Sequence, residues 1–277
     1  MRSKDFREKA RNALKGNWGI AILASLIASA LGASDGSVSF GSCFGGGSIG
    51  DSSSSGGSDA MMPEELVSII VGVGIAVILF SSAISIASLI VAGPIWVGYS
   101  RFNLALIDES ESKSIGILFS GFKNLKNAFL TKLLHGVYIA LAMVVGMIPC
   151  IILLIIWPNP IVLIFLILPI IFTVIVSLDY SMTGFVLAEK SYLSPKDALA
   201  ESKRLMNEKR GKLFSLEMSF IGWHLACICT LGIGYVFLAP YIEAAHAAFY
   251  REIKREDDEK FARLRQKVED MVDSKAV

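Results

Sequence analysis

Two glutamates and two histidines interrupt the apolar segments in the last quarter of the chain. Glu217 and His224 are seven residues apart and Glu243 and His246 are three apart, so each pair shares one face of a helix. Glutamate beside histidine can relay protons, and two of each can bind a metal ion. The same residues can instead form an interhelical clasp, in which each partner lowers the cost of burying the other.

The turn "LGIG" between the two pairs predicts which residues meet when the chain folds back on itself. Glu217 then lies within about 3 Å of His246 along the helix axis, and His224 lies within about 3 Å of Glu243. Two Glu–His contacts across a hairpin are therefore possible if the two faces point at each other. Clasp, proton relay and metal site remain alternatives.

Other residues carry weaker chemical signals. Asp179, beside Tyr180, can simply accept a hydrogen bond from a neighbouring amphipathic helix, and His135 is expected at the membrane interface. The four cysteines include no CxxC pair, and the chain has no nucleophile motif, phosphate loop or HExxH. We therefore expect a protein that is not an enzyme and that holds no cofactor and no metal.

The distribution of positive charge indicates a membrane protein. Of the 277 residues, 53% are hydrophobic and 18% are charged, whereas soluble domains carry about 25% charge. Lys and Arg are absent from 18–100, 133–189 and 213–250, and a cation at mid-bilayer costs roughly 2.5–3.5 kcal/mol. Nucleic acid is not an expected partner, because the basic segments contain nearly as many acids and no series of stacking aromatics.

Each apolar block is long enough for two legs of about 20 residues, or slightly fewer in the last block. The predicted legs are 18–31 and 66–92, 133–157 and 161–178, and 213–230 and 235–250. The predicted fold is thus all-α, with six transmembrane helices as three hairpins and an amphipathic interfacial elbow helix before each. Because the last two legs are short, that hairpin is expected to be tilted or partly re-entrant.

Basic residues favour the cytoplasmic side, so this topology places both termini in the cytoplasm. We predict a membrane domain at 1–250, with a flexible extracellular Ser/Gly loop at 33–62, and a charged, helical cytoplasmic tail at 251–277. A cleaved signal peptide is the alternative for the N-terminus. Trp18, Trp96 and Trp157 are expected at the interfaces, and Trp223 inside the bundle.

The elbows show their own helical patterns. The first places apolar residues on one face from Phe6 to Leu14. The second has apolar residues at helical spacing from Ile115 to Leu125. The third opens with "SPKD", which predicts Ser194 as the N-cap and Pro195 as the first helical residue.

Several segments, in this order, resemble a bacterial integral-membrane family known as domain of unknown function nine-seven-five. They are "REKARNALKGNWGIAILASLI", "LDYSMTGFVLAEK", "ALAESKRLM", "SFIGWHL", "CTLGIG" and "PYIEAAHAAFYREI". The resemblance implies a multi-spanning membrane protein with no established activity. It also looks distantly like the membrane domains of glycerophosphodiester phosphodiesterases, which hints at lipids but carries no catalytic residue across. The family is associated with apolar residues where His224 and His246 stand here.

These features favour a non-enzymatic, lipid-engaging or scaffold protein of the bacterial cytoplasmic membrane, whose partners are membrane lipids. The alternative is a small proton-coupled transporter or permease that uses the Glu/His set. An intramembrane hydrolase acting on lipid is a third possibility, but it needs a metal or a nucleophile in a water-filled cavity.

Overall fold

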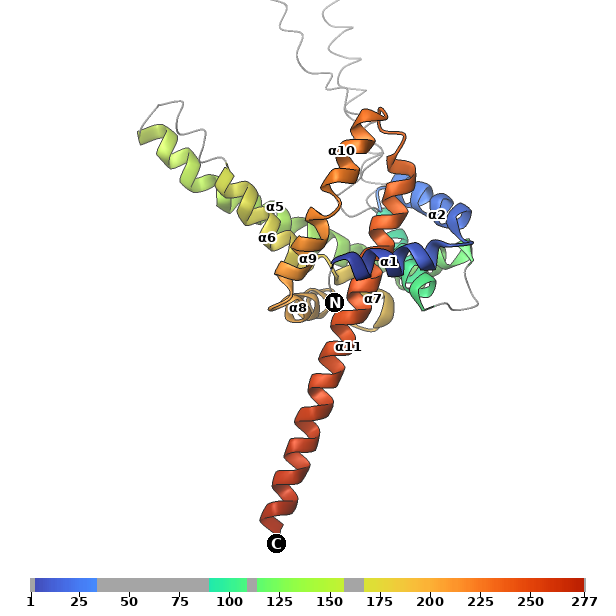
Figure 1. Ribbon diagram of the computed structural model, residues 1–277. Coiled ribbons are helices and arrows are strands. Elements are labelled where there is room, and N and C mark those ends of the chain that lie inside the picture. Colours follow the sequence, from blue (N-terminus) through green and yellow to red (C-terminus); the bar gives the residue numbers. More distant parts are fainter. Residues whose placement is uncertain (1–2, 34–89, 109–113, 157–166, 277) are drawn as a thin grey trace, which may run out of the picture.

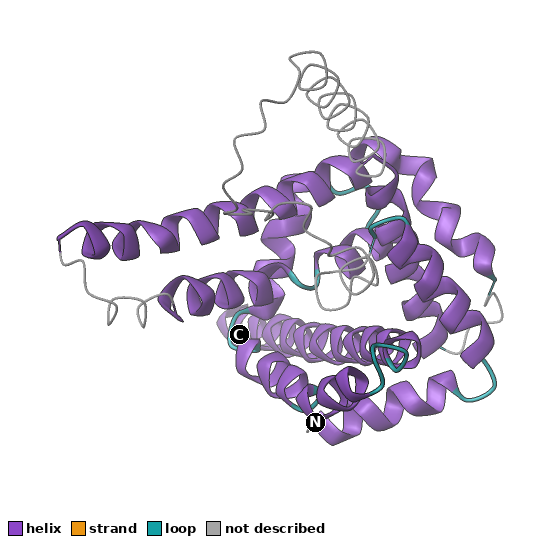
Figure 2. Cartoon of the chain, turned by 90° about the horizontal axis from the view of Figure 1, so that it is seen from above, coloured by secondary structure: helices purple, strands orange, loops and turns teal. Residues whose placement is uncertain are grey.

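The computed structural model describes residues 3–33, 90–108, 114–156 and 167–276, and every element among them is a helix. Figure 2 shows these helices from above, with no strand in the described ranges. The all-α prediction is therefore confirmed for this part of the chain. The predicted turn at 157–160, and almost all of the Ser/Gly loop and of leg 66–92, lie outside the described residues.

The first elbow and leg are α1 (Ser3–Leu14) and α2 (Trp18–Ala30). The buried residues of α1 recur every four positions and are Phe6, Ala10 and Leu14. This spacing buries one face of α1. Gly16 lies between the helices with φ +81°, which glycine adopts without a steric penalty. The two helices are bent by 104°, so they do not form one straight rod.

The helix Ile90–Ile107 packs closely against η1 (Ile115–Asn124) at two glycines. A Cβ added at Gly98 would lie 1.8 Å from the carbonyl oxygen of Leu118, and Gly121 approaches the opposite backbone just as closely. No side chain fits at such distances, so the contact depends on these two glycines.

The second elbow differs from its prediction, because η1 is a 3₁₀-helix rather than an α-helix. With three residues per turn, positions 115, 118 and 121 fall on one face. Leu118 and Gly121 are buried there, whereas Phe119 and Phe122 are exposed and stack on each other with ring centroids 6.2 Å apart. The elbow is amphipathic, but its two phenylalanines point outward.

The second block forms a pair of helices that projects from the rest of the molecule (Figure 1). α5 (Leu125–Ile156) packs along α6 (Ile167–Tyr180), and α7 (Thr183–Glu189) follows after a short turn. A Cβ at Gly146 would lie 2.9 Å from Pro169, so these helices approach closely. The described parts of both legs predicted for this block are thus helices that pack against each other.

The described chain has three helical stretches that are long and apolar enough to cross a membrane. They are Ile90–Ile107, Ile115–Leu153 and Ile167–Glu189, and the bent pair α1–α2 would be a fourth. In the most apolar window of Ile115–Leu153, only 11% of the residues are buried. Such an exposed apolar surface fits a membrane protein.

The third elbow confirms the predicted cap. α8 (Pro195–Met206) has Pro195 in its first turn, and the Ser194 hydroxyl accepts a hydrogen bond from the Asp197 amide at 3.3 Å. The Ser194 hydroxyl in turn donates to the Asp197 carboxylate at 2.6 Å. The first of these bonds satisfies one of the backbone donors that a helix start leaves free.

The last block departs from two simple legs. The predicted leg 213–230 is divided at Ser219 and Phe220 into α9 (Arg210–Met218) and α10 (Ile221–Cys229). α11 (Tyr235–Ala276) begins after the "LGIG" turn, where Leu231 and Gly232 have positive φ, and it runs on through the predicted helical tail. Neither α9 nor α10 is long enough to span alone, so the sixfold span count is not established by the described helices.

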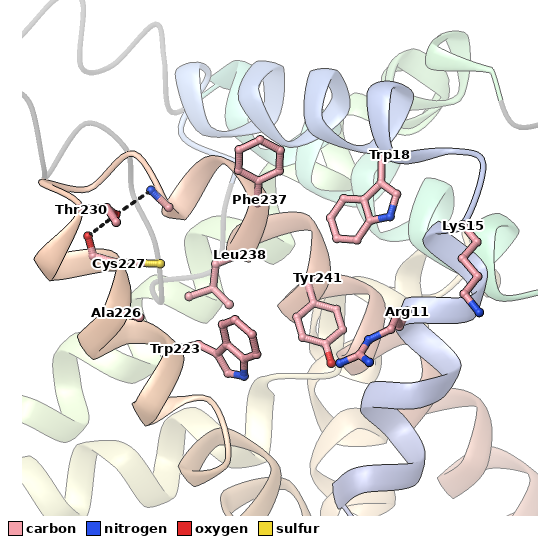
Figure 3. Close-up of a pocket in the computed structure, with 11 residues that line it drawn as sticks. Arg11, Lys15, Trp18, Trp223, Ala226, Cys227, Thr230, Phe237, Leu238 and Tyr241 are labelled. Atoms are coloured by element: carbon pink, nitrogen blue, oxygen red, sulfur yellow. Dashed lines mark hydrogen bonds between the residues drawn. The ribbon is translucent and has the colours of Figure 1, made fainter.

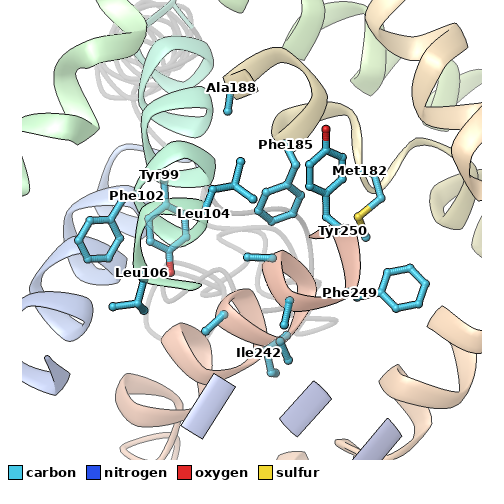
Figure 4. Close-up of a cluster of buried hydrophobic side chains, with 14 of the residues drawn as sticks. Tyr99, Phe102, Leu104, Leu106, Met182, Phe185, Ala188, Ile242, Phe249 and Tyr250 are labelled. Atoms are coloured by element: carbon cyan, nitrogen blue, oxygen red, sulfur yellow. The ribbon is translucent and has the colours of Figure 1, made fainter. Parts of the chain in front are cut away.

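The core lies where α11 meets the Ile90–Ile107 helix and α7 (Figure 4). Its largest side chains include Phe102 and Tyr250, and Phe185 stacks on Tyr250 with ring centroids 5.6 Å apart. Trp96, expected at an interface, is only 2% exposed. Trp96 instead contacts two polar residues of α5, Lys132 and His135.

Candidate functional site

Polar side chains from four helices converge on a cavity of about 430 Å³. α5 contributes Lys132 and His135, α9 contributes Glu217, and α11 contributes Glu243 and His246. α6 adds a hydroxyl and apolar residues to the wall. Three of the five predicted site residues therefore line one cavity.

One of the two predicted cross-helix contacts is confirmed. His246 Nε2 lies 2.6 Å from Glu217 Oε1, which joins α11 to α9. The side chains of Glu217 and His246 are 28% and 14% exposed, so the pair is neither sealed in a core nor open on a surface. Glu217 and His246 therefore join two helices and also line a cavity.

The second predicted contact joined His224 to Glu243. Glu243 lines this cavity, but His224 does not. The prediction treated 213–230 as one helix, so that Glu217 and His224 would share a face. The chain is divided between α9 and α10, and His224 does not line the cavity that Glu217 lines. His224 lies instead beside Tyr235, with ring centroids 5.7 Å apart.

His135, which was expected at the membrane interface, is buried among aromatic side chains. It is 6% exposed, and its ring lies 5.6 Å from Trp96 and 6.4 Å from Tyr180. Lys132 Nζ lies over the Trp96 ring at 4.4 Å from its centroid, a cation–π contact. The sequence signal was the spacing of Lys132 and His135, which puts both on one face of α5.

Asp179 is a structural anchor away from the cavity lining. Arg210 Nη2 donates to Asp179 Oδ2 at 2.9 Å, and the Ser202 hydroxyl donates to the Asp179 carbonyl at 2.9 Å. Both donors come from the third elbow region. Asp179 thus accepts hydrogen bonds from a neighbouring elbow, as the sequence predicted. Within the described ranges, no three His, Cys, Asp or Glu residues are grouped so that they could hold a metal ion.

A second hollow of about 650 Å³ lies between the α1–α2 bend and the α10–α11 hairpin, and sequence reasoning missed it. We call it the amphiphile groove. Its lining residues are Arg11, Lys15, Trp18, Trp223, Ala226, Cys227, Thr230, Gly234, Phe237, Leu238 and Tyr241. Figure 3 shows Arg11 of α1 and Lys15, which directly follows α1, at one end and Thr230 at the other. Apart from the cations, its side chains are mainly apolar or aromatic.

Trp223 was expected inside the bundle, but it is 48% exposed at this groove. Tyr241 is nearly buried, and its hydroxyl donates to the Arg7 carbonyl at 3.3 Å, which fixes α11 against α1. The available signal in the sequence was that Arg11 and Lys15, four residues apart, shortly precede Trp18. Nothing in the sequence alone brings those residues to Trp223.

Comparison with curated proteins and with solved structures finds no match. The resemblance to membrane domains of glycerophosphodiester phosphodiesterases thus stays an expectation. A family model does match residues 1–257, which include both the cavity and the groove. The chain belongs to this family, whose description is "Protein of unknown function (DUF975)".

Proposed function

We propose that this protein is a multi-pass membrane protein that engages anionic lipids at the cytoplasmic leaflet without catalysing a reaction on them. The observation that carries the proposal is the exposed apolar surface of α5 and α6. That hairpin has no Lys or Arg from 133 to 189, yet Lys126 and Lys132 precede this stretch and Lys190 follows it. Cations at one end of an apolar hairpin favour an anionic leaflet.

The charge distribution supports an orientation in which both termini lie in the cytoplasm and the Ser/Gly loop lies outside. The loop contains a natural probe, Cys43. In a chain whose other cysteines are serine, a membrane-impermeant maleimide should label Cys43 in intact cells. A cysteine at Ala262 of the tail should react only after the cells are permeabilised. The reverse pattern would contradict this topology.

Lipid engagement is tested by the lipids that remain with the purified protein. We expect anionic phospholipids to be enriched over their share of the source membrane, because basic segments attract them by about 1 kcal/mol per cation. A co-purifying pool with the bulk composition would contradict the proposal. So would a deletion strain with unchanged lipid composition and unchanged envelope-stress response.

A proton-coupled transporter is the second candidate, and the Glu217–His246 contact on a cavity favours it. Ionisable side chains inside a membrane protein commonly mark ion or substrate paths. Uptake of labelled small metabolites into proteoliposomes should then depend on a pH gradient and fall in Glu243→Gln and His246→Ala. Uptake that ignores both substitutions would remove this candidate.

A further inference from the structure

We propose that the amphiphile groove binds one acyl chain of an anionic phospholipid, whose phosphate lies between Arg11 and Lys15. This inference rests on the proposed lipid engagement and assigns it a site and a ligand class.

The walls of the groove suit a hydrocarbon chain. Leu238 and Cys227 are buried at 4% and 5% exposure and line the groove, whereas Phe237 and Trp223 are about half exposed. A volume of about 650 Å³ is within the range of sites that enclose small ligands. An acyl chain here would remove apolar surface from water, and it needs no hydrogen-bond partner.

Two cations at the end of the groove, Arg11 and Lys15, can bind an anion. Arg11 lies in the last turn of α1 and Lys15 directly follows the end of that helix, so two like charges lie four residues apart. Their neighbours are engaged, since Arg7 donates to the Ser219 carbonyl and Lys9 lies 3.9 Å from Glu252. Among the described residues, no carboxylate forms an ion pair with Arg11 or Lys15. A phosphate would meet the guanidinium in the geometry that arginine favours.

The aromatic residues place the groove at the depth of lipid headgroups. Trp18 begins α2 directly after the basic elbow, and Trp223 faces the same groove from α10. Tryptophan is enriched at membrane–water interfaces, where one edge is wet and the rest apolar. A lipid whose headgroup lies at this level can extend one acyl chain along α10 and α11.

The groove is held in shape without ligand. Tyr241 reaches Arg7 by the hydrogen bond already described, and the Gly234 amide donates to Thr230 Oγ1 at 3.2 Å in the turn at the far end (Figure 3). A preformed site loses less conformational freedom on binding. This favours a bound lipid over one that is merely part of the annulus.

The test uses the purified full chain and phosphatidylglycerol that carries a photoactivatable diazirine in one acyl chain. Cross-linked residues are located by mass spectrometry, and affinity is taken from labelling as a function of lipid concentration. We expect labels at groove residues such as Trp223 and Phe237. Phosphatidylcholine with the same chain should label them far less.

The charge arm compares Arg11→Gln/Lys15→Gln with the matched control Lys4→Gln/Lys196→Gln, which removes two exposed cations away from the groove. We expect the affinity for phosphatidylglycerol to fall about thirtyfold in the first variant, roughly fivefold to sixfold for each cation, and less than twofold in the control. Equal affinities in the two variants would overturn the site.

The shape arm compares Ala226→Trp, which fills the groove, with Leu225→Trp, an exposed neighbour that is not in the lining. We expect groove labelling to disappear only in Ala226→Trp. All four variants alter exposed positions, and a single symmetric peak in size-exclusion chromatography checks that each is folded. Labels confined to α5 and α6 would overturn the proposal.

Competition separates the possible occupants. Unlabelled phosphatidylglycerol should compete, whereas a fatty acid or inorganic phosphate at the same concentration should not; the reverse would overturn the phospholipid assignment. If anionic lipids are enriched on the purified protein but Arg11→Gln/Lys15→Gln changes nothing, the site is wrong and lipid engagement stands. If anionic lipids are not enriched at all, both proposals fall.

Discussion

The polar cavity and the amphiphile groove lie on two sides of the same helix. Leu238 and Tyr241 of α11 line the groove, whereas Glu243 and His246 line the cavity. Steps of three residues keep each pair on one face, and the two faces point in different directions. One helix thus presents an apolar wall to one hollow and an ionisable wall to the other.

The two hollows differ in whether their charges have partners within the protein. In the cavity, Glu217 meets His246, and Lys132 lies over Trp96. In the groove, Arg11 and Lys15 have no ion-pair partner among the described residues. A change in the cavity should therefore alter stability, and a change in the groove should alter ligand binding. The following predictions test that contrast, from the largest expected effect to the smallest.

Gly98→Ala should be the most damaging change, and it should act on the cavity side alone. The new Cβ would meet the Leu118 carbonyl oxygen, a backbone atom that cannot rotate away. We expect a loss of about 3 kcal/mol or more. The Ile90–Ile107 helix also carries Trp96, so the cavity should be disturbed while the groove, which this helix does not line, keeps its lipid.

The measurement is thermal unfolding in detergent together with phosphatidylglycerol labelling. Gly19→Ala is the control, because a Cβ at Gly19 in α2 would have no neighbour within 4 Å. It should be neutral or slightly stabilising, as alanine is favoured over glycine in helices. A Gly98→Ala protein as stable as this control would contradict the close approach of the two backbones.

Breaking the Glu217–His246 pair should cost about 1–2 kcal/mol, since the pair is only partly shielded from solvent. A double-mutant cycle with Glu217→Gln and His246→Gln separates their interaction from the separate effects of each change. His224→Gln should couple to Glu217→Gln less strongly than His246→Gln does, because His224 does not line the cavity. Coupling to His224 equal to that with His246 would restore the continuous helix predicted from the sequence.

Sequence periodicity predicted the cavity better than the groove for a physical reason. Glu217 and His246 lie at nearly equal distances on either side of the LGIG turn, so simple helix geometry gave their contact. The break at Ser219 and Phe220 could not be predicted, because no proline or glycine marks it. The groove joins residue 11 to residue 241, and contacts of such sequence separation depend on packing, which no local pattern encodes.

Acid should weaken the ion pairs of α8, the helix whose Arg204 also binds α11. Arg204 donates to Glu201 and to Asp257 of α11, and the hydrogen bond from Arg204 lowers the pKa of Glu201 to about 2. A carboxyl whose folded pKa is depressed stabilises the fold above its unfolded pKa of 4.5. That contribution is lost as pH falls from about 4.5 towards 2.

Because Glu201 is partly solvated, we expect only about 1 kcal/mol from this group. Thermal unfolding between about pH 5 and pH 3 should show that much less acid sensitivity in Glu201→Gln than in the wild type. Glu259→Gln removes an exposed carboxylate 3.9 Å from Arg263 and should leave the pH profile unchanged. An identical acid response in all three proteins would contradict the role of Arg204 and Glu201.

Trp223→Ala should have the smallest effect on the lipid-free protein, and this result separates the two hollows most clearly. The side chain is 48% exposed, so its removal should change the free energy of unfolding by less than about 0.5 kcal/mol. A ligand that binds only the folded chain stabilises it by about 2.7 kcal/mol at a hundred times its dissociation constant. Wild type should gain thermal stability with phosphatidylglycerol, Trp223→Ala should gain much less, and Leu225→Ala outside the groove should match the wild type.

Glu217→Gln should show the opposite pattern, since it lowers stability without lipid but leaves the lipid-dependent gain intact. If both variants lost stability and lipid response together, the cavity and the groove would be one coupled site, and α11 would transmit the binding of a lipid to the Glu217–His246 pair.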